Sequence, residues 1–189
     1  MSVELTRDQI EHALPRIAPG LRRYLWLQER LRATDLRVDP EYRRHFNYFY
    51  RVRRGTDWQD KFYYLLETSK RRAVTFAEIL HVLHEATGRY EASFASKLVA
   101  TINPNMPVID SVVLRNLNLA LPRYNAKDRF ERLVRLHRIL VSWFRAFLKT
   151  GTGRYLTKRF REEYPSVRIS EIKMLDLALW QTRPNRPLD

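Results

Sequence analysis

The chain has 189 residues, 44% of them hydrophobic, which is enough for one domain or two closely packed lobes around a buried core. Thirty-five Lys and Arg residues against 21 Asp and Glu give a formal net charge of +14, which favours a polyanionic partner: DNA, RNA or an anionic membrane. The absence of cysteine excludes disulfides, thiol nucleophiles, iron–sulfur clusters and cysteine-ligated zinc.

Cofactors and membrane segments are not expected either. His81 and His84 are three residues apart, but no third ligand stands near them, so we expect no metal. No apolar stretch approaches the roughly 20 residues that span a bilayer. The polar N-terminus, Met1 to Gln9, lacks the apolar region of a signal peptide. We therefore expect a cytoplasmic protein that is associated with the nucleoid if its partner is DNA.

Helix signals dominate the first part of the chain. Thr6 to Gln9 reads as a capping box that opens a first helix. Asp39 and Pro40 supply a cap and a first-turn proline for a second helix, and Thr56 to Gln59 can open a third. Thr75 to Glu78 is another capping box, followed by a buried stripe at spacings of three and four.

The same apolar periodicity continues to the C-terminal region. It predicts helices up to Ile102, from about Ala126 to Lys149, and around Ile172 to Leu179. Strand-like alternation is absent, so the fold class is all-α: a two-lobed helical bundle with a helix-hairpin-helix motif. We expect a single domain over residues 1–189, with an inner lobe of about 70–149 and a second lobe from 1–69 plus 150–189.

Aromatic residues are concentrated between positions 42 and 64, interleaved with arginines. Their density exceeds what one core stripe needs, so some are candidates for stacking on a nucleic-acid base, although core packing is the better explanation of any single one. The candidates for a base pocket are Tyr48, Tyr50, Phe62 and Tyr63. Arg53 and Arg54 beside them suit a nucleic-acid surface or a solvated helix face. Arg132, Arg135 and Arg138 also share one helix face and are possible phosphate contacts.

A helix, a tight turn and a second helix occupy Leu80 to Ile102. The turn contains Gly88, Arg89 and Tyr90, and Lys97 lies on the second helix, so this hairpin is a candidate phosphate-binding site. A proline-bearing segment then delivers Asp110 to the start of another helix. An aspartate there is usually a simple N-cap, and that role is compatible with a catalytic one because capping fixes the carboxylate.

These features resemble the helix-hairpin-helix DNA glycosylase superfamily over about Phe76 to Leu119. The matching parts are Ala95, the segment from Pro107 to Asp110, and the apolar residues that follow it. The resemblance implies that Asp110 is the catalytic carboxylate of a base-excising enzyme that flips its target nucleotide out of duplex DNA. It also makes Glu67, Thr68 and Ser69 candidates for a wedge at a helix end.

The chain departs from the family pattern at two points. Its hairpin has one glycine, Gly88, and Glu91 falls near the usual second glycine, where a carboxylate repels phosphate unless it points away. Family members that also cut the strand carry a lysine two residues before the matching alanine, where this chain has Ser93. Lys97, one turn further on, is read as a phosphate contact or a solvated lysine.

The expected function is therefore a divergent, monofunctional DNA glycosylase that works as a monomer without a cofactor and leaves an abasic site. Its target would be a modified or damaged base, and a hypermodified phage base, cut in antiviral defence, is one candidate. Two alternatives stay open: a non-catalytic helix-hairpin-helix DNA-binding protein, and an RNA-binding or nucleoprotein partner.

Overall fold

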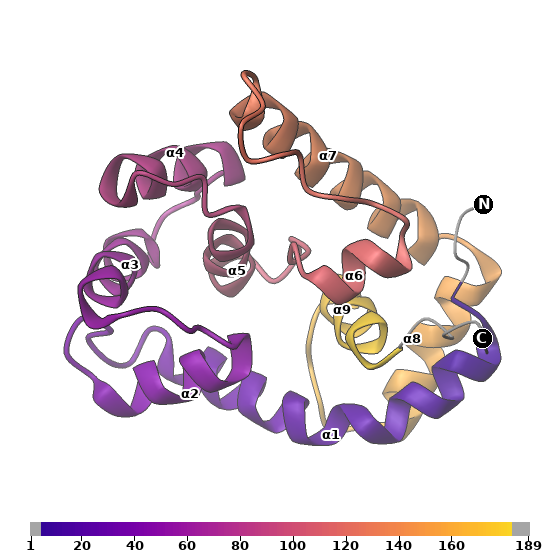
Figure 1. The fold of residues 1–189 in the computed structure, drawn as a ribbon. Helices are drawn as coiled ribbons and strands as arrows, with labels where there is room; N and C mark the ends of the chain where they lie inside the picture. The colour runs from indigo at the N-terminus through magenta and orange to yellow at the C-terminus, as the bar shows by residue number, and fades with distance from the viewer. Residues whose placement is uncertain (1–4, 183–189) are drawn as a thin grey trace, which may run out of the picture. The chain divides into compact units, whose positions relative to one another are not determined.

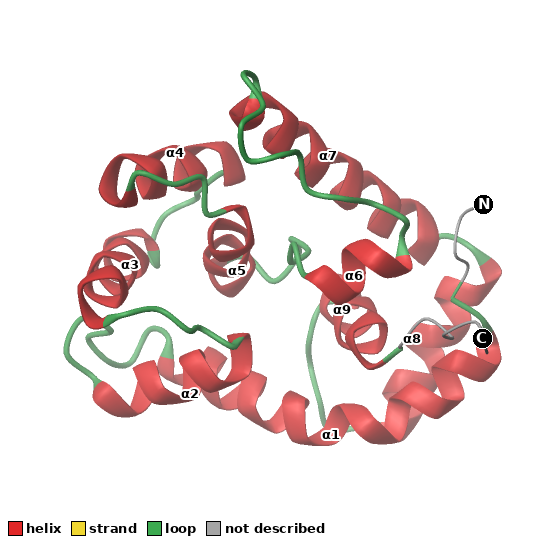
Figure 2. Cartoon of the chain, viewed as in Figure 1, coloured by secondary structure: helices red, strands yellow, loops and turns green. Residues whose placement is uncertain are grey.

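The computed structural model describes residues 5–182, which form nine α-helices and no strand, so the all-α prediction is confirmed (Figure 1). Figure 2 shows the loops that connect these helices, among them a long one from α6 to α7. Part of the polar N-terminus, residues 1–4, lies outside the described residues. The helices are α1 (Arg7–Arg30), α2 (Pro40–Tyr50), α3 (Thr56–Ser69), α4 (Phe76–Thr87), α5 (Ala92–Ile102), α6 (Ser111–Asn116), α7 (Arg129–Leu148), α8 (Gly151–Glu163) and α9 (Glu171–Gln181).

Side-chain caps begin several helices at the residues that the sequence indicates. Thr6 and Gln9 form the expected reciprocal box: each backbone N–H donates to the other residue's side chain, at 2.9 and 3.2 Å. Asp39 accepts from the Tyr42 N–H at 2.9 Å, and Thr75 accepts from the Glu78 N–H at 3.1 Å. Each cap satisfies an N–H group that has no partner within its own helix.

The chain forms two compact units. The inner unit is Pro19–Asn103, and the terminal unit combines Met1–Ala18 with Pro104–Asp189. These boundaries differ from the lobes expected from the sequence, which were placed near residues 70 and 149. The difference arises because α7 packs against α8 and α9, and therefore belongs with the C-terminal helices and not with the hairpin.

In the inner unit, α5 supplies much of the core. All of its residues from Ala95 to Thr101 are buried, and it packs against the apolar stripe of α4. The ring of Phe46 lies 5.5 Å from the ring of Phe62 and 5.7 Å from that of Tyr63, which joins α2 to α3. Much of the aromatic cluster therefore belongs to the core.

In the terminal unit, α9 is the central helix. Its residues Ile172 to Leu179 are all buried, and it packs against α6, α7 and α8. The first turns of α1 join this group through Glu11, which accepts hydrogen bonds from Tyr155 and Arg159 of α8 at 2.9 Å each. Within residues 5–182, none of the helices combines the length and apolarity needed to span a bilayer.

Candidate functional site

Asp110 is the N-cap of α6, as the sequence predicts. Its Oδ1 accepts a hydrogen bond from the Val112 N–H at 2.8 Å, and the helix is held down by the buried side chains of Val113 and Leu114. The aspartate itself is half-buried. Its Oδ2 accepts no hydrogen bond from the residues that the structure describes, so one oxygen fixes the carboxylate and the other remains able to act on a ligand.

The segment before Asp110 is fastened at two carbonyl groups. Ser170, the N-cap of α9, donates its hydroxyl to the Pro104 carbonyl at 2.5 Å. The His137 side chain on α7 is hydrogen bonded to the backbone of Pro107. Proline has no N–H, so the imidazole must be the donor and the carbonyl the acceptor. Val108 and Ile109 are buried at 4% and 1% exposure, which fixes the chain just before the aspartate.

The other end of α6 is also anchored. Asn116 is 4% exposed, and its Nδ2 donates to the carbonyls of Leu179 and Thr182, at 2.9 Å each. These carbonyls belong to the last turn of α9, whose terminal acceptors have no partner within their own helix. The result is a short helix that is fixed at both ends and presents a carboxylate from its N-cap.

Helices α4 and α5 are joined by the turn at residues 88–91 and pack against each other. Gly88 ends α4 in the left-handed region, at φ +69°, and its N–H donates to the His84 carbonyl. A glycine adopts this conformation without the steric cost that a Cβ brings. Tyr90 stacks on His84 with ring centroids 4.0 Å apart, and Arg89 is exposed.

Glu91, the residue that departs from the family pattern, is paired with a predicted DNA-binding residue. Arg54 donates from Nη2 to both of its carboxylate oxygens at 3.0 Å. The carboxylate is only 11% exposed. Its charge is therefore compensated within the protein, although the same pair also occupies Arg54. Arg53 next to it is exposed.

Lys97 is not available as a phosphate contact, which corrects the sequence-based interpretation. It is 8% exposed, and its ammonium group donates to the Tyr50 carbonyl at 3.0 Å. The group lies inside the core of the inner unit because α5 is buried along most of its length. Ser93 is half-buried at the start of α5.

Three of the four base-pocket candidates are core residues, so their assignment to a pocket is wrong. Phe62 and Tyr63 are 0% exposed and Tyr50 is 7% exposed. The Tyr63 hydroxyl donates to Asn47 Oδ1 at 2.7 Å, and burial raises the pKa of this phenol. Tyr48 differs from the others: it is 68% exposed, and the guanidinium of Arg23 lies 3.9 Å from the centre of its ring.

The wedge candidates at the end of α3 have structural roles. Glu67 Oε2 accepts from the Leu36 N–H at 2.9 Å and from the Lys70 ammonium at 2.7 Å, which ties α3 to the segment after α1. Ser69 is fully buried. Thr68 is exposed, but its hydroxyl donates back to its own helix, to the Tyr64 carbonyl at 3.0 Å. Only Thr68 is therefore open to a partner.

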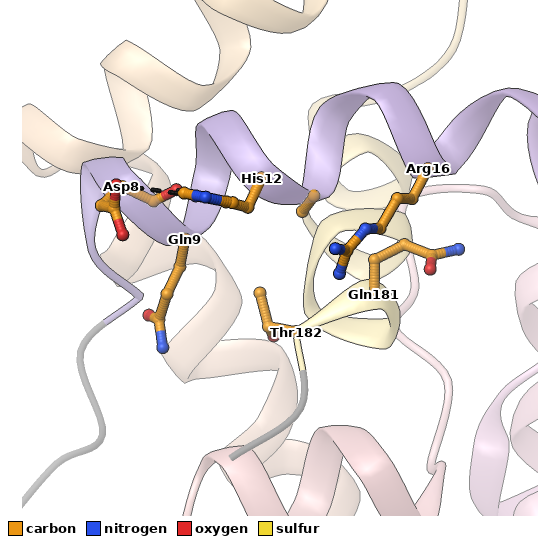
Figure 3. A pocket seen from close by; sticks show the side chains of 7 residues that line it. Asp8, Gln9, His12, Arg16, Gln181 and Thr182 are labelled. Atoms are coloured by element: carbon orange, nitrogen blue, oxygen red, sulfur yellow. Dashed lines mark hydrogen bonds and ion pairs between the residues drawn. The ribbon is translucent and has the colours of Figure 1, made fainter. Parts of the chain in front are cut away.

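An open hollow of about 280 Å³ lies in the terminal unit, between the start of α1 and the end of α9 (Figure 3). His12 Nδ1 lies 3.5 Å from Asp8 Oδ1 there, but both side chains are mostly exposed. None of the predicted site residues lines this hollow, and no group of three metal-ligand side chains occurs among residues 5–182. Its lining residues are Asp8, Gln9, His12, Ala13, Arg16, Gln181 and Thr182.

The residues that hold the Asp110 segment were not identified from the sequence. His137 has a weak signal, because it falls within the apolar repeat of α7. Ser170 and Asn116 have no signal beyond residue type. The partner of Ser170 lies 66 positions away, and those of Asn116 lie 63 and 66 positions away. Comparison of the chain with protein-family models, curated proteins and solved structures gave no match.

Proposed function

We propose that the protein is a monofunctional DNA glycosylase in which Asp110 is the catalytic residue. The observation that carries this proposal is the fixed carboxylate: one oxygen caps α6, the other is open, and the preceding segment is fastened at Pro104 and Pro107. The resemblance of the hairpin and of the Pro107 to Asp110 segment to the helix-hairpin-helix glycosylases supplies the reaction class.

The chemistry requires a single well-placed negative charge. Cleavage of an N-glycosidic bond builds positive charge on the sugar, which passes through an oxocarbenium-like state. A carboxylate held in advance stabilises that charge and can orient or activate the attacking water. In this proposal the Val112 N–H keeps the orientation of Asp110 fixed while its second oxygen faces the reacting sugar.

The absence of strand cleavage follows from the surroundings of the lysine. A lyase needs an amine that attacks the sugar, and Ser93 occupies the corresponding position. Lys97 is buried and hydrogen bonded to the Tyr50 carbonyl, so its ammonium is not presented to a substrate. The product is therefore an intact strand with an abasic site.

The test is an excision assay over a panel of duplexes, each with one oxidised, alkylated, deaminated, mismatched or hypermodified base. We expect strand breaks at one class of base only after alkali treatment, and no covalent adduct on borohydride trapping. Breaks without alkali, together with an adduct at Lys97, would contradict the monofunctional assignment. If no duplex in the panel gives an abasic product while DNA still binds, the protein is a binding protein and the proposal fails.

A further inference from the structure

The outer face of α7 carries a row of basic side chains. Arg135, Arg138, Arg145 and Lys149 are all exposed, and their spacing of three, seven and four residues places them along one side of the helix. The buried residues of α7, among them Leu133, Leu140 and Phe144, fall on the opposite side. We call these four residues the α7 stripe. At 1.5 Å per residue it runs for about 21 Å.

No ion pair compensates the charge of the α7 stripe within the described residues, although Arg135 lies near enough to Asp128 to help lower the pKa of that carboxyl. None of its four side chains forms an ion pair or donates a hydrogen bond there, whereas neighbouring Arg132 is paired with Asp128 at 2.8 Å. No Asp or Glu occurs between positions 132 and 161. The helix dipole accounts for cations in the last turn, such as Arg145, but not for Arg135 and Arg138 near the middle.

We propose that the α7 stripe binds the phosphate backbone of duplex DNA. A rigid row of cations suits a partner with regularly spaced charges, and each strand of a duplex carries one phosphate per about 3.4 Å of its axis. An amphipathic helix that enters a membrane surface uses its apolar face, and in α7 this face is buried in the terminal unit. Only Ile139, 46% exposed, is a large exposed hydrophobic residue among the described positions of α7.

The stripe is a contact separate from the proposed catalytic residue. His137, which holds the Pro107 carbonyl, is buried and lies on the core side of α7. The stripe therefore faces away from the segment that carries Asp110. It binds without regard to sequence or base modification, because phosphate contacts carry no base information.

The experiment compares two variants with the same loss of charge. One replaces the α7 stripe with Gln at all four positions. The control replaces four exposed arginines from other segments, which are Arg16, Arg22, Arg32 and Arg71. Each variant has four positive charges fewer than the +14 of the chain. Binding to an unmodified 30-base-pair duplex is followed by fluorescence anisotropy between about 50 and 200 mM salt, after melting curves have shown that both variants fold.

We expect the stripe variant to bind at least about tenfold more weakly. The slope of its logarithmic salt dependence should fall by about 3.6, since each of the four phosphate contacts adds about 0.9. The salt-dependence slope of the control variant should fall by less than about 1. Equal losses of DNA affinity in both variants would show that the stripe contributes only through the net positive charge of the protein and is not a specific contact. Normal DNA binding together with lost binding to phosphatidylserine vesicles would assign it to membranes instead. Both results overturn the proposal.

The outcome is independent of base excision. The duplex contains no modified base, so the α7 stripe can be confirmed even if no glycosylase activity is found. Conversely, a stripe variant that binds DNA normally would overturn the α7 stripe and leave the excision test of the proposed function intact.

Discussion

Two carbonyl groups and one carboxylate define the geometry of the candidate site at the scale of single residues. Ser170 donates a hydrogen bond to the Pro104 carbonyl, and His137 donates one to the Pro107 carbonyl. The Asp110 carboxylate accepts one from the Val112 N–H. Each hydrogen bond contributes only about 1 kcal/mol net. Together they restrict a segment of seven residues, and this restriction keeps the carboxylate in one orientation.

His137 makes the stability of the fold depend on pH. Burial lowers the pKa of its imidazole from 6.5 to about 4. The unfolded chain therefore binds the proton more readily, so stability is complete above about pH 6.5 and falls as the pH drops toward 4. The full effect is about 3 kcal/mol. His137→Gln should flatten this dependence in urea unfolding at pH 7, 5.5 and 4, whereas exposed His12→Gln should not. Parallel profiles for wild type and His137→Gln would contradict the assignment.

Asn116 should be among the least replaceable polar residues of the terminal unit. Its amide donates to two carbonyls at the end of α9. Asn116→Ala removes the amide donor from the Thr182 carbonyl and leaves the Leu179 carbonyl with the Thr182 hydroxyl as its remaining side-chain donor. We expect a loss of about 2–3 kcal/mol in the free energy of unfolding. Asn125→Ala, at an exposed loop position, serves as the control and should change little. A difference below about 0.5 kcal/mol between the two would show that α6 is held by apolar packing alone.

At the scale of elements, the start of α8 lies very close to the backbone at the end of α7, and the point of closest approach is Gly153. A Cβ on Gly153 would clash with the Phe147 carbonyl oxygen and would lie 2.6 Å from the Leu148 Cα, so backbone would have to move. At Gly151, two residues earlier in the same helix, a Cβ would meet nothing within 4 Å. The two glycines are therefore a matched pair.

Substitution by alanine should separate them. Gly153→Ala should cost about 2 kcal/mol or more, because overpacking against backbone cannot relax by a rotamer change. Gly151→Ala should be neutral or stabilising by up to about 1 kcal/mol through helix propensity. Thermal and urea unfolding of both variants measure the difference. Equal stabilities would mean that α8 does not begin as closely against α7 as the structure shows.

The hairpin illustrates what local sequence can and cannot predict. Gly88, the capping boxes and the apolar stripes depend on neighbours within four residues, so their positions follow from the sequence. The pairing of Arg54 with Glu91 joins residues 37 positions apart, and no local pattern indicates it. The burial of Lys97 is of the same kind, because residue type alone favours exposure.

At the scale of the whole molecule, the all-α class and the helix-start positions were predictable because helix periodicity and capping depend on residues only a few positions apart. The division into units was not, since it depends on which faces of α7, α8 and α9 pack together. The aromatic cluster was misread for a related reason. A dense run of aromatic residues gives no sign of which rings point into the core, and Phe62 and Tyr63 do so completely.

The central claim is that Asp110 is catalytic, and Asp110→Asn tests it most directly. Asparagine is as good an N-cap as aspartate, so α6 and the fold should persist while the negative charge is lost. The measurement is the single-turnover excision rate on the duplex that the wild type processes, with Asp128→Asn as a control that also removes one cap-position carboxylate. We predict a loss of at least about 100-fold for Asp110→Asn with unchanged DNA binding, and a normal rate for the control. A normal excision rate in folded Asp110→Asn would contradict the account.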